Sequence, residues 1–301
     1  MELLLALLLA PLLTGVIRRV KAGVAGRAGP PLSQAYRDIW KLAHKGAVYS
    51  RTTSWVFRAG PPVALACTAA ALALAPTGSL AALVRFPGDL VLLVALLALA
   101  RFAMVLAALD TGSAFEGMGA SREVAFAALA EPALLLAMAS LARSTGATSL
   151  SAIAAGITAE AWLASGGLLL LVSAALLGIL LVENARIPFD DPATHLELTM
   201  VHEVMVLDHS GPDLAAIELA SSWKLWLFAA ILASVTVPVR SGAFALDALA
   251  HVAGVFAVGI AVGVVESSMA RLRLVRVPQM LVGLALLALL SVLLAAGRLA
   301  P

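Results

Sequence analysis

The chain has 301 residues, of which 62% are hydrophobic and 13% are charged, and its formal net charge is +2. Soluble domains carry roughly 25% charged residues, so this composition predicts a membrane protein. The small net charge does not indicate a nucleic-acid partner. The only cysteine, Cys67, excludes an internal disulfide and a cysteine-ligated iron–sulfur, nickel or zinc centre. If the chain takes part in redox chemistry, the metal centres must lie in partner subunits.

Apolar stretches of about 20 residues are long enough to span a bilayer. Eight such stretches lie at about 1–20, 56–76, 88–109, 122–142, 162–183, 223–240, 246–270 and 277–297. All are predicted to be helices, because lipid offers no partner to the backbone of an open sheet and strand-like alternation is absent. The first stretch is followed, not preceded, by Arg18 and Arg19, which favours a transmembrane helix over a signal peptide. We therefore expect an all-α polytopic membrane protein, with residues 1–301 forming a single integral membrane domain.

The basic residues of the connections predict the orientation. With the N-terminus outside, the inner connections are 18–58, 110–122, 184–224 and 271–276, and they hold fifteen Lys and Arg against four on the outer side. Cytoplasmic loops carry the excess of such residues. We therefore expect both termini on the outer side of the plasma (inner) membrane and the two long connections, about 18–58 and 184–224, in the cytoplasm.

Each long connection contains a predicted helix. In SQAYRDIWKLAHKG, residues 33–46, apolar residues at helical spacing predict an amphipathic helix of about three turns, for which a position on the membrane surface is the plainer interpretation. In ENARIPFDDPATHLELTMVHEVMVLDHSG, residues 183–211, Asp191 as N-cap and Pro192 at the first helical position predict a second helix. It is expected to run to about Leu207, to be ended by Ser210-Gly211-Pro212, and to be buried against other helices.

Segment 183–211 is rich in titratable groups, with six carboxylates and three histidines. His195 and His202 are seven residues apart, which is about 10.5 Å along a helix and too far for one metal ion. His209 lies beyond the expected helix, so hydrogen bonds to carboxylates are a better interpretation than a metal site. The chain contains no G-x-S-x-G, P-loop or G-x-G-x-x-G motif, so no catalytic residue and no nucleotide site are expected, and Cys67 is interpreted as a core thiol.

Several ionisable residues lie at membrane depth or at its edge. They are Arg101, Asp110, Arg122, Glu123, Glu131, Glu183, Arg186 and Glu266. Each costs at least ~2.5–3.5 kcal/mol within a bilayer, so they are expected to face one another or a watered cavity. One interpretation is a set of structural ion pairs, such as Arg101 with Asp110 or Glu131 with a neighbouring arginine. Because the set gathers at one side of the membrane beside a carboxylate-rich loop, a proton path is favoured.

Three ordered elements resemble a known family. ENARIPFDDP, residues 183–192, is similar to the E-x-x-R-x-P-F-D-x-P element of the membrane subunit that forms the roof of the quinone chamber in respiratory complex I, the complex I subunit 1 family. Arg122-Glu123 with Glu131 resembles the R-E-…-E helix of that family, and RAGPPLSQAYRDIWKLAHK, residues 27–45, resembles its amphipathic helix. The resemblance covers essentially the whole chain, and the eight spans agree with it.

The departures from this pattern point to a sister branch. Pro31-Leu32-Ser33 stands where complex I versions usually carry Asn-Arg-Val-Gly, and Ala193 and His195 stand where they usually carry Glu. Residues 190–213 and the run from Glu266 to Arg273 instead resemble the membrane subunit of formate hydrogenlyase and related group 4 membrane-bound [NiFe] hydrogenases. The missing glutamates count against a bound quinone head group.

The resemblance implies roles for individual residues. The carboxylate path that it implies, from the redox interface into the membrane, is Glu131, Glu183, Asp190, Glu197 and Glu203, and from their place in the spans we add Glu123 and Glu266. The resemblance implies that Arg122 and Arg186 tune this path, and we add Arg101 and Asp110. It implies that Asp38, Lys41 and their helix dock the peripheral arm, and we add Arg37, His195 and Asp208.

The resemblance also implies partners. It describes a non-catalytic subunit that joins hydrogenase large and small subunits and a ferredoxin-like iron–sulfur subunit to antiporter-like membrane subunits in the lipid bilayer. The [NiFe] centre and iron–sulfur clusters would lie in those partners, with no cofactor in this chain. The alternative is a quinone-chamber subunit of an NADH:quinone oxidoreductase-like complex. An independent transporter is less favoured, because the halves show no inverted repeat.

Overall fold

The structure is a computed structural model and describes residues 1–190 and 201–297, within which the chain is helical and forms no strand. The predicted all-α membrane fold is confirmed, because eight helical segments are long and apolar enough to cross a bilayer. These are α1 (Glu2–Val24), α3 (Trp55–Ala73), α4 (Asp89–Asp110), α5 (Ala114–Thr145), α7 (Ala159–Glu183), α9 (Gly211–Thr236), α10 (Phe244–Ser268) and the pair η1 (Leu274–Arg276) and α11 (Val277–Gly297). The shorter helices are α2 (Gln34–Ala43), α6 (Leu150–Gly156) and α8 (His202–Met205).

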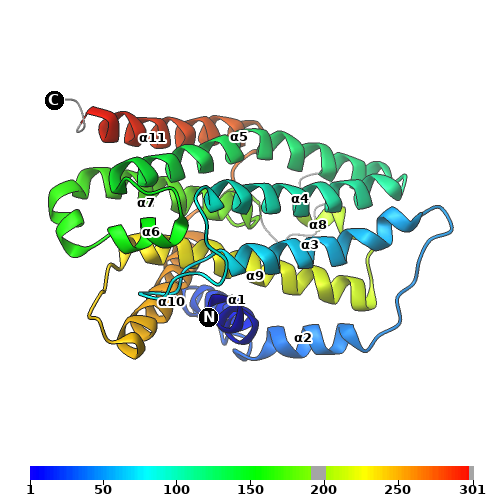
Figure 1. Cartoon of the computed structure of the whole chain (residues 1–301). Helices are drawn as coiled ribbons and strands as arrows, with labels where there is room; N and C mark the ends of the chain where they lie inside the picture. Colours follow the sequence, from blue (N-terminus) through cyan, green and yellow to red (C-terminus); the bar gives the residue numbers. More distant parts are fainter. Residues whose placement is uncertain (191–200, 298–301) are drawn as a thin grey trace.

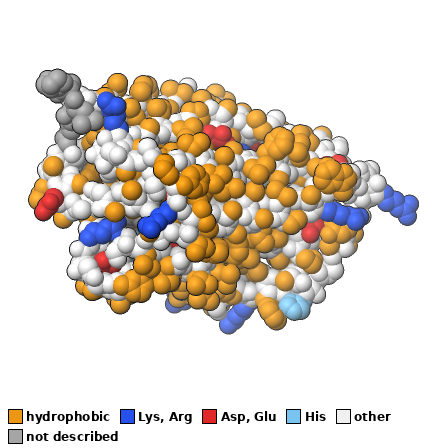
Figure 2. Space-filling model, in the orientation of Figure 1, with side chains coloured by type: hydrophobic (Ala, Val, Ile, Leu, Met, Phe, Trp, Pro, Cys, Tyr) orange, Lys and Arg blue, Asp and Glu red, His pale blue; other side chains and the backbone are white. Residues whose placement is uncertain are grey.

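Most of the long helices run in a similar direction and stack into a bundle (Figure 1). α11 packs on α5, α5 on α4 and α7, and α3 lies between α4 and α9. α1 and α10 pack on each other and on α9, across the direction of the other helices. Hydrophobic side chains cover much of the face shown in Figure 2, as expected for a surface in contact with lipid or other membrane subunits.

Local sequence explains where several helices begin and end. The Ser54 hydroxyl accepts a hydrogen bond from the Val56 amide at 3.2 Å and caps α3, and the Thr158 hydroxyl does the same for the Ala161 amide at the start of α7. These hydroxyls satisfy amide groups that a helix N-terminus leaves unpaired. At the other end of α5, Gly146 has φ +68°, a left-handed conformation that terminates a helix.

Close packing of α1 on α10 depends on glycine. A Cβ added at Gly263 would lie 2.9 Å from the Val20 side chain, and one at Gly259 would overlap Leu13. Without side chains at these two positions, the two helices can approach closely where they cross. This crossing brings Lys21, in the last turn of α1, beside Glu266 near the end of α10.

The predicted amphipathic helix of the first connection is confirmed as α2. The structure differs from the predictions in the presence of α6 and in the starts of α9 and α5. α9 begins at Gly211, twelve residues before the predicted span at 223, so Ser210-Gly211-Pro212 starts a helix and does not end one. Gly211 has φ +56° and Pro212 lies in the first turn, where its missing amide costs no hydrogen bond. Similarly, α5 begins at Ala114 and not at 122.

The helix predicted from Asp191 to about Leu207 is only partly testable, because 191–200 lie outside the described residues. Of the remainder, only α8 is helical, so the prediction is wrong for residues 201, 206 and 207. The chain turns there because the Asp208 amide donates to a carboxylate oxygen of Glu116, from the first turn of α5, at 3.1 Å. Packing against α5 therefore overrides the helical pattern of the sequence.

Candidate functional site

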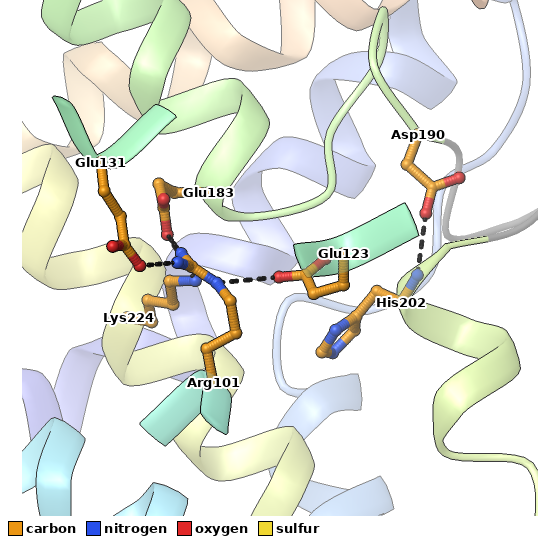
Figure 3. Close-up of polar contacts among 7 residues, drawn as sticks. All are labelled: Arg101, Glu123, Glu131, Glu183, Asp190, His202 and Lys224. Carbon is orange, nitrogen blue, oxygen red and sulfur yellow. Dashed lines mark hydrogen bonds and ion pairs between the residues drawn. The ribbon is translucent and has the colours of Figure 1, made fainter. Parts of the chain in front are cut away.

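Arg101 of α4 lies at the centre of a cluster of acidic side chains (Figure 3). Its Nε is 3.1 Å from Glu123 Oε1, its Nη2 is 2.5 Å from Glu183 Oε2, and its Nη1 donates to Glu131. Glu123 and Glu131 belong to α5, and Glu183 is the last residue of α7. The side chains of Arg101 and Glu183 are only 8% and 2% exposed. Each therefore supplies the hydrogen bonds and opposite charge that offset the other's loss of hydration.

Lys224 of α9 completes this cluster (Figure 3). Its Nζ is 2.9 Å from Glu183 Oε2, the same oxygen that Arg101 contacts. The Arg101 cluster, defined as Arg101, Glu123, Glu131, Glu183 and Lys224, thus holds three acidic and two basic groups drawn from four helices. Fully ionised, it carries one net negative charge, and one added proton makes it neutral. Burial of Arg101 and Glu183 favours neutrality, and Glu123 and Glu131 are partly exposed, so this composition suits the uptake of a single proton.

Asp190 forms a second polar centre just beyond α7. One of its carboxylate oxygens lies 2.8 Å from Arg271 Nη2, and the other accepts the backbone amides of Val201 and His202, each at 3.2 Å. Figure 3 shows Asp190 and His202 beside the Arg101 cluster. Asp190 is buried, so these contacts fix the start of α8 against the turn that follows α7.

Glu266 of α10 holds two cations together. Its carboxylate lies 2.8 Å from Lys21 Nζ and 3.5 Å from Arg186 Nη1, and the carboxylate itself is buried. Burial lowers the pKa of Arg186, and the Glu266 carboxylate opposes this effect. The interaction joins α1, α10 and the turn after α7.

Two cavities connect these groups. A cavity of about 80 Å³ is lined by Arg101, Glu123, Glu183, Lys224 and His202, among others. A larger one of about 380 Å³ is lined by Lys21, Asp38, Arg186, Asp190, His202, Glu203 and Glu218, among others. Asn184, Ala185, His202, Ile217 and Ser221 line both. Each cavity has room and polar partners for water molecules, and His202 stands where the two adjoin.

The structure brings four of the predicted path and tuning residues into one cluster, Arg101 with Glu123, Glu131 and Glu183. The expected pairing of Glu131 with a neighbouring arginine is therefore confirmed. The alternative pairing of Arg101 with Asp110 is wrong, because nine residues of one helix, about 13.5 Å, separate them. Asp110 instead accepts the Ser54 amide at 2.6 Å and the Ser54 hydroxyl at 2.9 Å, at the start of α3.

The remaining path and tuning residues lie around the larger cavity or apart from it. Asp190, Glu203 and Arg186 line that cavity. Arg122 is half-buried on α5, where its guanidinium lies 2.9 Å from Met118 Sδ. Glu197 lies outside the described residues.

The predicted docking residues divide between surface and interior. Arg37 and Lys41 are exposed on α2, and Asp208 is exposed before α9. Asp38 points the other way: it lines the larger cavity and accepts a hydrogen bond from Gln34 Nε2 at 2.8 Å. His195 lies outside the described residues.

Sequence reasoning missed three cations of the site, Lys21, Lys224 and Arg271, which it counted only as loop charges. Lys224 was placed at the edge of a span because the start of α9 was predicted too late. A lysine inside an apolar run is itself a signal, since such a residue needs a buried acidic partner. Among the described residues, no group of three or more His, Cys, Asp or Glu side chains lies close enough to hold a metal ion.

Comparison with known proteins gives the family. The family described as NADH dehydrogenase matches residues 1–296. Formate hydrogenlyase subunit 4 of Escherichia coli (strain K12) is 33% identical over 294 residues, which cover 94% of this chain and 94% of that protein. Hydrogenase-4 component C of the same strain is 33% identical over 237 residues, which cover 78% of this chain and 72% of that protein.

A solved structure confirms the fold. A chain of the membrane-bound sulfane sulfur reductase, an archaeal respiratory membrane complex, superposes with a TM-score of 0.78 at 22% identity, covering 97% of this chain and 96% of its own length. The eight candidate spans of the present chain make it a multi-pass membrane protein. On the extent of these matches, the chain belongs to the NADH dehydrogenase family and is similar, over most of its length, to a subunit of formate hydrogenlyase and a component of hydrogenase-4.

Proposed function

We propose that this chain is the membrane-anchoring and proton-coupling subunit of a membrane-bound [NiFe] hydrogenase complex similar to formate hydrogenlyase. The observation that carries the proposal is the Arg101 cluster, which adjoins a polar cavity through His202. The similarity to formate hydrogenlyase subunit 4 and hydrogenase-4 component C supports the type of complex. The chain itself would be non-catalytic.

Proton coupling follows from the charges of the cluster. A proton enters through water in the larger cavity, passes His202, and is taken up by one of the three carboxylates around Arg101. Protonation of one carboxylate weakens its ion pair and leaves Arg101 and Lys224 to the others. The proton thus changes which carboxylates Arg101 and Lys224 contact. This change of contacts is the link between redox events on the cytoplasmic side and ion movement in the membrane.

The proposed partners contact two different parts of this chain, its cytoplasmic surface and its membrane-spanning helices. The exposed α2 residues Arg37 and Lys41 would contact the peripheral arm of hydrogenase and iron–sulfur subunits, which would hold the [NiFe] centre and clusters. The exposed apolar faces of the long helices would meet antiporter-like subunits and lipid. The complex would lie in the plasma membrane, with both termini of this chain outside, as the basic residues of the connections predict.

The alternative function, a quinone-chamber subunit, is favoured by one observation. The larger cavity, about 380 Å³, is of a size that holds small ligands. Its lining counts against a quinone, because cofactor pockets are mostly apolar with few polar groups. Here eight titratable residues line the cavity, among them Lys21, Asp38 and Glu218.

Purification of the intact complex tests the proposal. The chain carries an affinity tag, the membrane is extracted in a mild detergent, and the product is analysed for subunits, nickel and iron. We expect nickel, iron–sulfur clusters and hydrogen evolution to accompany the chain. Inhibitor-sensitive quinone reduction in a preparation without nickel would instead establish the alternative.

A further inference from the structure

A cavity of about 830 Å³ lies away from the Arg101 cluster, at the end of the bundle where α4, α7 and α10 begin. It is bounded by the connections at 78–87 and 146–158 and by Arg240, just after α9. The adjoining helices include α4, α7, α9 and α10, which are all candidate spans. The cavity therefore lies where membrane helices emerge from the hydrocarbon layer. At this end, Figure 2 shows basic side chains beside an area with little hydrophobic colour, near the position of α6 in Figure 1.

The lining has the chemistry of an anion site. Two arginines, Arg85 and Arg240, line the cavity with hydroxyl groups such as those of Thr148 and Ser151, and no Asp or Glu is among the lining residues. Two buried carboxylates, Asp89 and Asp247, lie nearby, and the charge of Asp247 acts on Arg240. Asp89 accepts the Ser149 hydroxyl and the Leu150 amide, both at 2.7 Å, and Asp247 accepts the Ser241 amide at 2.7 Å.

Arg240 is fixed in place. It donates to the carbonyl of Ala154 at 2.6 Å and to that of Gly78, so it joins the two connections that bound the cavity. Its Nε is a buried donor without a partner among the described residues. An unpaired buried donor is costly, so a bound water or another acceptor is expected beside this nitrogen. Arg85 is exposed at the same cavity and adds a second, adaptable donor.

The surroundings of Arg85 identify the source of the anion. Its neighbours Leu83, Val84 and Phe86 are 73%, 45% and 41% exposed, which gives the cationic cavity an apolar border. An inorganic phosphate would fill a small part of about 830 Å³, whereas a glycerophosphate head group with the start of its acyl chains needs such a volume. We infer that this cavity binds the head group of an anionic phospholipid, with Arg85 and Arg240 contacting the phosphate.

Binding to the purified full-length chain in a non-ionic detergent tests this inference. The probes are short-chain phosphatidylglycerol, short-chain phosphatidylcholine and inorganic phosphate, with binding followed by ³¹P NMR and native mass spectrometry. Arg85→Gln is the first variant, because Arg85 is exposed and we expect its replacement to leave the fold intact. Arg240→Lys keeps the charge but loses the planar pair of donors. Arg143→Gln, at the same end of the bundle but outside the cavity, is the matched control.

We expect phosphatidylglycerol to bind more tightly than phosphatidylcholine, because the choline cation would face the two arginines. Arg85→Gln should weaken it about tenfold, the effect of losing one charge-assisted contact, with a comparable loss in Arg240→Lys and none in Arg143→Gln. Unchanged phosphatidylglycerol binding in Arg85→Gln would overturn the inference. Inorganic phosphate that binds as well as the lipid would assign the cavity to a free anion and overturn the lipid as its ligand.

Discussion

Removing Lys224 tests whether the Arg101 cluster is one coupled unit. In Lys224→Met, the buried Glu183 loses the ammonium 2.9 Å from its Oε2 and keeps only Arg101. Loss of one partner of a buried ion pair costs about 3–5 kcal/mol when the other charge is left unpaired. Because Arg101 still contacts Glu183 here, and Lys224 is partly exposed, we expect a smaller loss of about 1–3 kcal/mol in the free energy of unfolding.

The assay is a double-mutant cycle on the purified chain, unfolded by titration with a denaturing detergent. Lys224→Met, Glu183→Gln and the double variant are compared, and the exposed Lys45→Met serves as the control. Residues in direct contact show coupling energies of about 0.5–3 kcal/mol, so the double variant should lose less than the sum of the single losses. Strictly additive losses would refute the direct interaction, and a large loss in Lys45→Met would show that the assay reports charge alone.

Two further predictions concern the cytoplasmic edge and the α1–α10 crossing. Burial lowers the pKa of His209, so below pH about 6.5 the unfolded chain binds a proton that the folded chain does not. The midpoint temperature of thermal unfolding should therefore fall as the pH is lowered from 7 to 5. This fall should shrink in His209→Gln but persist in the exposed His44→Gln; an unchanged fall in His209→Gln would contradict it. The Gly263→Leu side chain should overlap Val20 and lower the free energy of unfolding by about 1–3 kcal/mol, measured by thermal unfolding. Gly283→Leu is the control, because a Cβ there meets open space and should cause no such loss. Equal losses in the two variants would be evidence against close α1–α10 packing.

Hydropathy and motif spacing were sufficient to predict the fold. Each span is a long apolar run, and the α2 pattern stands out because its polar and apolar faces are distinct. The early start of α9 was missed because its first residues include Asp213 and Glu218, which lower the hydropathy of the segment although one helix continues through it. Helix ends of this kind depend on tertiary contacts that a local window does not contain.

The site could be predicted as a set of residues but not as a set of contacts. Arg101, Glu123, Glu131 and Glu183 stood out because ionisable groups inside apolar helices need partners. Which partners meet depends on how α4, α5 and α7 are rotated and how deeply each is placed. Charge spacing along one sequence carries no such information, and for this reason the Arg101–Asp110 pairing was wrong.

The central claim is that carboxylates of this chain couple redox turnover to proton movement. The most direct measurement is proton movement per hydrogen evolved, in sealed membrane vesicles that contain the assembled complex. We predict that Glu183→Gln and Glu203→Gln leave assembly and the nickel content intact but reduce proton movement, while Glu160→Gln, at the far end of α7, behaves as the unaltered protein. Normal proton movement with full hydrogen evolution in both the Glu183 and Glu203 variants would contradict the claim.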